Sequence, residues 1–224
     1  MSFFDASSEP LPRRLRDGLE RLASVLKADQ WSAANAAGLN PTQAHVLSFL
    51  AGRGEAGMRV RAIAEHLGVT QPTATDSIAA LERKRLVTKG PDASDARAVA
   101  VRVTEAGRDA VKAIGLSTMA TDTALAGLSA AEQADLLLLV VKLIRSLQIA
   151  GALPEQRTCV TCRHFRPNAH PGIDTPHHCA FVNAAFGTRH LRLDCGEHET
   201  AEPSAQAATW RAFTTASAPL QTNR

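Results

Sequence analysis

One block of the chain, residues 40–112, carries helical and strand patterns in an order that few folds can accommodate. It contains three short helical patterns, followed by two β-forming runs that flank a polar tip. Gly68 ends the second helix and Thr70 caps the third, so that a tight turn joins them. This order predicts a winged helix-turn-helix domain, in which the third helix, ending near Arg85, enters the major groove of DNA.

The third helix of this block would present its polar face to DNA. Ala74, Ile78 and Leu81 recur at spacings of four and three residues and form the inner, apolar face. Small polar residues lie roughly opposite, and they suit insertion into a groove. The candidates for base contacts are Gln71, Pro72, Thr73, Asp76 and Ser77.

Basic residues around this helix would bind phosphates, and the wing would reach an adjacent groove. At the polar tip, Arg97 is the candidate for a minor-groove or phosphate contact, and Asp95 could orient it. Because the net charge is only +3, clustering of basic residues must attract DNA. The candidates for phosphate contacts are Arg59, Arg61, Arg83, Lys84, Arg85 and Lys89.

The segments LNPTQAHVLSFL, IAEHLGVTQPTATDSIAALERKRLVTK and DASDARAVAVRVTEAG resemble the MarR family of winged-helix regulators. The resemblance covers roughly residues 11–148. It implies a homodimer that binds pseudo-palindromic double-stranded DNA and usually represses transcription until a small-molecule effector or an oxidant releases it. The wing motif of the family stands here as Asp95, Arg97, Thr104 and Gly107.

Two positions depart from the pattern of that family. Arg85 stands where the family generally has glycine, and Asp76 stands where a basic residue is common. The Asp76 carboxylate could accept a hydrogen bond from a cytosine amino group, or it could hold a neighbouring arginine in place. Both interpretations of Asp76 stay open.

Residues 1–39 and 113–150 each contain an apolar helix. The second helix begins with Ser129 and Glu132, which have the capping-box spacing, and its apolar face is too broad for a lone surface helix. Burial within one subunit and pairing with a second copy would both cover these faces, and we favour a homodimer whose terminal helices intertwine. The first helix has leucines at three- and four-residue steps, namely Leu11, Leu15, Leu19, Leu22 and Leu26.

All four cysteines of the chain lie in one segment, residues 151–199. The N-terminal residues do not form a secretory leader and the longest apolar run is too short to cross a bilayer, so we expect a cytoplasmic protein without membrane contact. Disulfides are rare in that reducing compartment. The segment has few regular elements, and a bound metal would supply the missing folding free energy. The candidate ligands are Cys159, Cys162, Cys179 and Cys195.

The spacing of these cysteines favours a [4Fe-4S] cluster and leaves zinc open, because thiolates bind both. A zinc ribbon normally pairs two C-x2-C knuckles, whereas this segment has one, and Arg163 follows it where glycine is common. Six histidines in the segment leave a mixed Cys/His site as an alternative, although surface or outer-shell positions are the simpler expectation. The residues expected to shield a cluster from solvent are Phe165, Phe181, Phe186 and Leu191.

These features predict a mainly α-helical fold with a small β-wing: a winged helix-turn-helix, a helical dimerisation region and a small C-terminal metal-binding module. Residues 200–224 are rich in Ala, Ser, Thr and Pro and are expected to be disordered, although Trp210 and Phe213 could dock a short helix.

The favoured function is a sequence-specific DNA-binding regulator, acting as a homodimeric repressor whose iron–sulfur cluster senses redox or iron status. The alternative keeps the DNA binding, with a structural zinc and a phenolic or aromatic effector in the dimer cleft. An enzyme or electron carrier is disfavoured, because the sequence has no Gly-rich phosphate loop, no supported Ser/His/Asp arrangement and no cofactor fingerprint.

Overall fold

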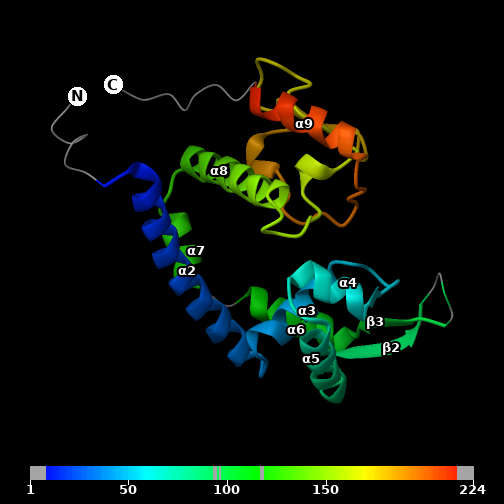
Figure 1. Ribbon diagram of the computed structural model, residues 1–224. Coiled ribbons are helices and arrows are strands. Elements are labelled where there is room, and N and C mark those ends of the chain that lie inside the picture. The colour runs from blue at the N-terminus through cyan, green and yellow to red at the C-terminus, as the bar shows by residue number, and fades with distance from the viewer. Residues whose placement is uncertain (1–8, 93–94, 96, 117–118, 216–224) are drawn as a thin grey trace.

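The structure is a computed structural model that describes residues 9–92, 95, 97–116 and 119–215. Figure 1 shows its elements in two groups, one around α3–α6 and the wing and one around α8 and α9, with the long helix α2 beside them. The described helices are α2 (Leu11–Ala36), α3 (Pro41–Ala51), α4 (Val60–Leu67), α5 (Gln71–Arg83), α6 (Glu105–Gly115), α7 (Ala120–Ala126), α8 (Ala130–Ile149) and α9 (Pro203–Thr215).

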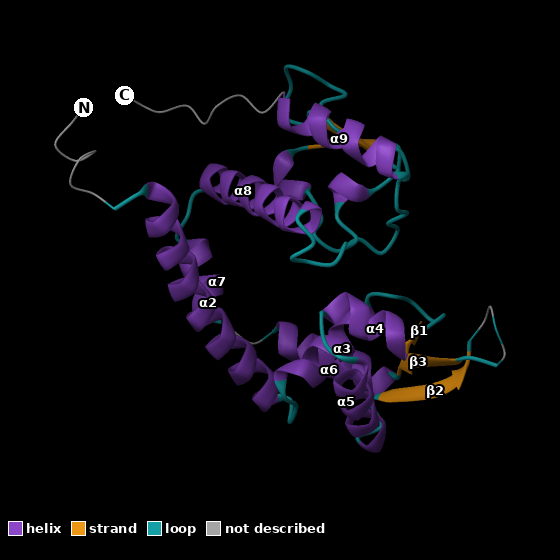
Figure 2. Ribbon diagram, viewed as in Figure 1, coloured by secondary structure: helices purple, strands orange, loops and turns teal. Residues whose placement is uncertain are grey.

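Two small antiparallel sheets, coloured orange in Figure 2, complete the described fold. The first sheet has the order β1-β3-β2 and the second has the order β4-β5-β6. Two 3-10 turns, η1 (Cys159–Thr161) and η2 (Thr188–His190), lie in the second group. The strands are β1 (Met58–Arg59), β2 (Val87–Pro91), β3 (Val99–Val103), β4 (Phe165–Arg166), β5 (His177–Cys179) and β6 (Ala184–Phe186).

The mainly helical winged-helix fold confirms the predicted fold class. Helix α3 begins at Asn40 with a capping box, and helix α8 begins at Ser129 with a capping box to Glu132. Gly68 ends α4 in the left-handed conformation (φ 63°), which lets the chain turn at once toward the cap of α5. These local signals set the helix starts and the tight turn as the sequence predicts.

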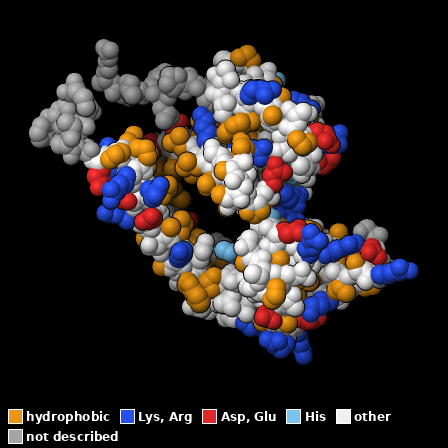
Figure 3. All heavy atoms as spheres, viewed as in Figure 1, with side chains coloured by type: hydrophobic (Ala, Val, Ile, Leu, Met, Phe, Trp, Pro, Cys, Tyr) orange, Lys and Arg blue, Asp and Glu red, His pale blue; other side chains and the backbone are white. Residues whose placement is uncertain are grey.

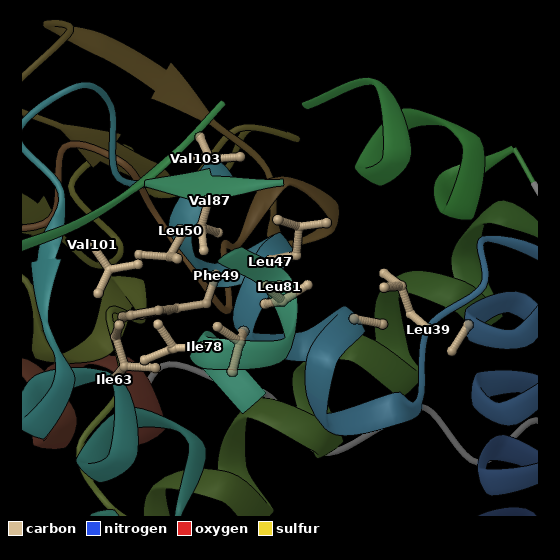
Figure 4. Close-up of a cluster of buried hydrophobic side chains, with 13 residues drawn as sticks. Leu39, Leu47, Phe49, Leu50, Ile63, Ile78, Leu81, Val87, Val101 and Val103 are labelled. Carbon is tan, nitrogen blue, oxygen red and sulfur yellow. The ribbon is translucent and has the colours of Figure 1, made fainter. Parts of the chain in front are cut away.

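The winged-helix domain, residues 40–112, is built on one apolar core. Figure 4 shows side chains from α3, α4, α5 and both long strands of the wing meeting between these elements. Burying these side chains holds α5 against α3 and α4, so the inner face of α5 is fixed and its other face points outward. The fully buried members include Val46, Leu47, Leu50, Ile63, Ile78, Leu81, Val87 and Val101.

A tight contact joins the end of β3 to the start of α6. The backbone N–H of Gly107 donates to Thr104 Oγ1 at 3.0 Å, and that hydroxyl lies 2.9 Å from the carbonyl oxygen of Arg85. A Cβ atom at Gly107 would lie 2.1 Å from the carbonyl oxygen of Leu86. The threonine and the glycine therefore position α6 against the segment that follows the recognition helix.

The C-terminal part of the structure, residues 151–215, packs on α8, and we call it the cysteine module. Its core unites Val141 of α8 with Val160, Phe165 and Phe213. The predicted disorder of residues 200–224 is wrong for 203–215, which form α9. Of the same predicted range, residues 216–224 lie outside the described residues.

Helix α9 forms because tertiary contacts stabilise it. The side chain of Phe213 is 1% exposed and stacks among other aromatic rings of the module. Gln206 is also buried, and its Oε1 accepts from the guanidinium of Arg145 at 2.8 Å. Such contacts override a composition that is typical of disordered tails. No helix among the described residues has the length and apolarity that a bilayer crossing requires.

Candidate DNA-binding surface and cysteine-lined cavity

The predicted recognition helix is α5, and most of its candidate base-contacting residues are exposed. Thr70 caps the helix by accepting a hydrogen bond from the backbone N–H of Thr73 at 3.3 Å. Thr75 is also exposed, although the sequence pattern did not single it out. The predicted residues that lie on the exposed surface are Gln71, Pro72, Thr73 and Asp76. Their contacts with bases, and the role of Asp76, stay predictions.

Ser77 is a correction to the predicted DNA-facing surface. Ser77 is only 8% exposed, and it lies on the same face of α5 as the buried residues Ala74, Ile78 and Leu81. Positions 74, 77, 78 and 81 follow the spacing of one helix face, so the small serine takes a core-facing position beside the larger apolar side chains. Ser77 therefore belongs to the packing of α5 and not to its outward face.

The wing is held at its base by ion pairs. The guanidinium of Arg59 donates two hydrogen bonds to the carboxylate of Asp92, at 3.1 and 3.2 Å, and lies 3.7 Å from Asp95. Asp95 in turn accepts a hydrogen bond from the backbone N–H of Arg97 at 3.0 Å. Arg59, predicted as a phosphate ligand, thus ties β1 to the wing, whereas Arg97 is exposed near the tip.

Other predicted phosphate ligands also have partners within the protein. Arg61 pairs with Glu65 one turn along α4, and Lys89 pairs with Glu82. The ammonium of Lys84 donates to Gln43 at 3.2 Å, which ties the end of α5 to α3. Binding a phosphate at these positions would therefore compete with existing contacts.

Arg83 and Arg85 lie at the C-terminal end of the recognition helix and are exposed. Arg85 has φ 60°, a left-handed conformation that favours glycine. This explains why the resemblance placed glycine at this position. Figure 3 shows Lys and Arg side chains on the winged-helix part of the molecule, and also on α2 and on the C-terminal part.

The four cysteines of this segment line one cavity of about 270 Å³ in the cysteine module. Cys159 and Cys162 come from the η1 turn, Cys179 ends β5, and Cys195 follows η2. Among the aromatic residues predicted to shield a cluster, Phe165, Phe181 and Phe186 line the cavity, and Leu191 is buried in the adjoining core.

Hydrogen-bond donors point at two of the cysteine sulfurs. The backbone N–H of Arg192 donates to Cys159 Sγ at 3.2 Å, and its guanidinium lies 3.6 Å from Cys195 Sγ. Burial raises the pKa of the Cys159 thiol to about 11. Metal binding would therefore release a proton from this thiol.

Within the described ranges, no three His, Cys, Asp or Glu side chains are close enough together to hold a single metal ion. A metal ligand set is therefore not established by the geometry. The cavity instead gathers four thiols around a volume much larger than one ion requires. This distinction bears on the choice between zinc and a cluster.

The histidines of the segment mainly hold the module together. His164 hydrogen-bonds Glu199 at 3.0 Å, and His170 hydrogen-bonds His178 at 3.2 Å. His177 is buried among the rings of Phe165 and other aromatic residues, and burial lowers its pKa. His164 and His190 also line the cavity.

Two exposed apolar stripes lie on the terminal helices. Figure 3 shows hydrophobic side chains along α2. On α8, one stripe faces the cysteine module through Leu137, Leu138 and Val141, whereas the other remains exposed. The exposed leucines are Leu11, Leu15, Leu19, Leu22 and Leu26 on α2 and Leu136, Leu139, Leu143 and Leu147 on α8.

The turn between α4 and α5, the outward face of α5 and the β2–β3 wing define a winged helix-turn-helix protein. Residues 37–98 match the model described as the MarR family. The winged-helix part of this chain is therefore similar to the MarR family in sequence, and it shares its fold with solved members of that family.

Solved structures show the same fold with an additional region in this chain. CouR from Rhodococcus jostii RHA1, solved with p-coumaroyl-CoA, is 24% identical with a TM-score of 0.51, covering 66% of this chain and 98% of CouR. MepR from S. aureus, solved with DNA, is 24% identical with a TM-score of 0.50, covering 62% and 100%.

A MarR family transcriptional regulator from Streptomyces coelicolor is 22% identical with a TM-score of 0.52, covering 65% of this chain and 100% of that protein. The three comparisons leave about a third of this chain uncovered, which accords with an extra C-terminal region. No curated protein matches the chain.

Proposed function

We propose that the protein is a sequence-specific DNA-binding transcription regulator that acts as a homodimeric repressor. The observation that carries this proposal is the outward face of α5 together with the exposed Arg97 near the wing tip, on a domain whose core holds α5 against the strands of the wing. The recognition helix would lie in the major groove and the wing would reach the adjacent minor groove. MepR, which has the same fold, was solved with DNA.

Replacing Arg97 by alanine tests the wing. We expect weaker DNA binding and a shallower dependence on salt, with the slope of log K against log salt falling by about one, as for the loss of a phosphate contact. Fluorescence anisotropy at several salt concentrations measures both. Arg211→Ala removes an exposed arginine of α9 and should change neither. Unchanged affinity and slope in Arg97→Ala would remove the wing from the interface.

A second copy of the chain is the proposed partner of the exposed stripes on α2 and α8. Several leucines on each helix are about half exposed, at the three- and four-residue spacing of one helix face. Water contact with so many leucines is costly, and covering them by the same stripes of a second subunit would remove that cost. Two recognition helices would then face the two halves of a pseudo-palindromic operator.

We propose further that the cysteine cavity holds a [4Fe-4S] cluster whose redox state or loss changes DNA affinity. In such a cluster each thiolate binds a different iron, so the four sulfurs need not converge on one point. Zinc would draw them together at about 2.3 Å from one ion, roughly 3.8 Å from each other. The cavity volume, the aromatic lining and the N–H donors toward sulfur support the cluster.

Metal analysis of anaerobically purified protein tests the cofactor. We expect a broad absorption band near about 400 nm that bleaches in air, with about four irons and four sulfides per chain. Cys179→Ser should lose this band. One zinc per colourless chain would contradict the cluster. It would favour the alternative regulator, with a structural zinc and an aromatic effector such as the p-coumaroyl-CoA found with CouR.

A further inference from the structure

One ion pair joins the winged-helix domain directly to the cysteine module. The guanidinium of Arg53 donates two hydrogen bonds to the carboxylate of Asp194, at 2.9 and 3.2 Å. The Arg53 side chain is 4% exposed, although the Asp194 carboxylate is accessible to water. A two-point contact with a buried guanidinium fixes both distance and orientation, unlike a surface ion pair between flexible side chains.

On the DNA-binding side, Arg53 is packed against the helix-turn-helix. Its guanidinium lies over the ring of Phe49, 4.2 Å from the ring centre. Phe49 is buried in the core and stacks on the ring of His66, which belongs to α4, with ring centres 4.0 Å apart. A displacement of Arg53 would therefore disturb the packing of α4, and α4 is the helix that packs on α5.

On the other side, Asp194 lies directly before a residue of the cysteine cavity. The next residue, Cys195, lines the cavity, and its backbone N–H donates to the carbonyl of Arg157 at 3.0 Å. The Arg157 guanidinium donates to the carbonyl of Gly196. A metal centre bound to the Cys195 sulfur would thus fix the backbone that carries the Asp194 carboxylate.

We propose that the Arg53–Asp194 pair transmits the state of the cysteine cavity to the helix-turn-helix. With a metal centre bound to Cys195, Asp194 stays in place and holds Arg53 over Phe49. When the centre is lost, Asp194 moves with Cys195, and the buried guanidinium loses its anion, so Arg53 and α4 rearrange. This inference rests on the metal-sensing function proposed above and identifies the contact through which the sensing operates.

The test compares the DNA dissociation constants of metal-loaded and metal-free dimers. The wild-type ratio should differ from one by about fivefold or more, as typical allosteric couplings do. Asp194→Asn keeps the shape but removes the charge, and it should bring the ratio close to one while the metal content stays complete. Asp174→Asn, an exposed carboxylate of the same module, is the matched control and should keep the wild-type ratio.

A wild-type ratio in fully loaded Asp194→Asn would overturn the proposed contact and leave metal sensing intact. A ratio of one in the wild-type protein would instead overturn sensing itself, and with it the transmission. If Asp194→Asn loses its metal, Arg53→Lys decides, because lysine keeps the charge but cannot make the two-point contact. In Arg53→Lys, the ratio of the two dissociation constants should lie closer to one than in the wild-type protein. A wild-type ratio in that variant would again contradict the proposal.

Discussion

Gly107 shows how one backbone position fixes the placement of α6 relative to the wing. A methyl group there would meet the Leu86 carbonyl oxygen at 2.1 Å and the Val103 side chain at 2.7 Å. We expect Gly107→Ala to lower the free energy of unfolding by about 1–3 kcal/mol, as overpacking does. Urea denaturation followed by circular dichroism measures the change.

Gly115, in the same helix, is the matched control for that substitution. A Cβ atom at Gly115 meets nothing within 4 Å, so alanine should leave stability unchanged or raise it by up to about 1 kcal/mol. Equal stability of the Gly107→Ala protein and the wild type would show that the β3–α6 contact can relax at no cost.

Residue-level prediction from sequence succeeded where the signal is local. Thr70 and Ser129 cap the helices they were predicted to cap, because a cap needs only residues within one turn. It failed for Ser77, because the burial of that residue depends on how α5 packs. The ion pair of Arg59 with Asp92, which lies 33 residues away, also had no local signal, and the phosphate contact of Arg59 stays a prediction.

Helix α8 has two apolar faces, one packed on the cysteine module and one exposed, and the exposed face provides the sharpest test of the proposed dimer. Leu143 is 50% exposed on that face. Leu143→Glu should place charges at the subunit interface and weaken the dimer by at least about tenfold, which sedimentation equilibrium measures. The metal content should not change, because the opposite face of α8 contacts the cysteine module.

Ile173→Glu is the control for the charge itself, since Ile173 is 55% exposed in a loop of the cysteine module. It should leave the association state unaltered. A dimer of wild-type affinity in Leu143→Glu would place the subunit interface elsewhere.

At the level of elements, amphipathic periodicity and caps predicted α3, α4, α5 and α8, and β-forming runs predicted the wing. Strand β1 has two residues, too few for any periodic pattern, and forms because β3 offers it an edge. A short helix docked through Trp210 and Phe213 was only the alternative to disorder, because α9 is stabilised through Phe213 and Gln206, whose partners lie far away in the sequence. The convergence of four cysteines on one cavity followed their clustering, whereas the contact of Arg53 with Asp194 had no sequence signal.

In the whole molecule, the two groups of elements should respond differently to metal removal. Apolar side chains build the winged-helix core without a ligand, whereas the module core adjoins the cysteine cavity. We expect chelation to increase amide hydrogen exchange in residues 156–200 by at least about tenfold, with little change in α3. Mass spectrometry of peptides measures both regions. Equal protection before and after chelation would mean that the module folds without metal.

The cysteine module packs on α8 and covers apolar side chains of that helix, so its removal would change the surface of the rest of the protein. Cutting the chain after α8 would bare Leu137 and Val141, and the helix would then present apolar surface on two sides at once. A helix of that kind invites open-ended self-association, because one side pairs two subunits while the other recruits further copies. Proteolytic trimming should therefore yield aggregates, so we expect the winged-helix domain to depend on the cysteine module for its solubility.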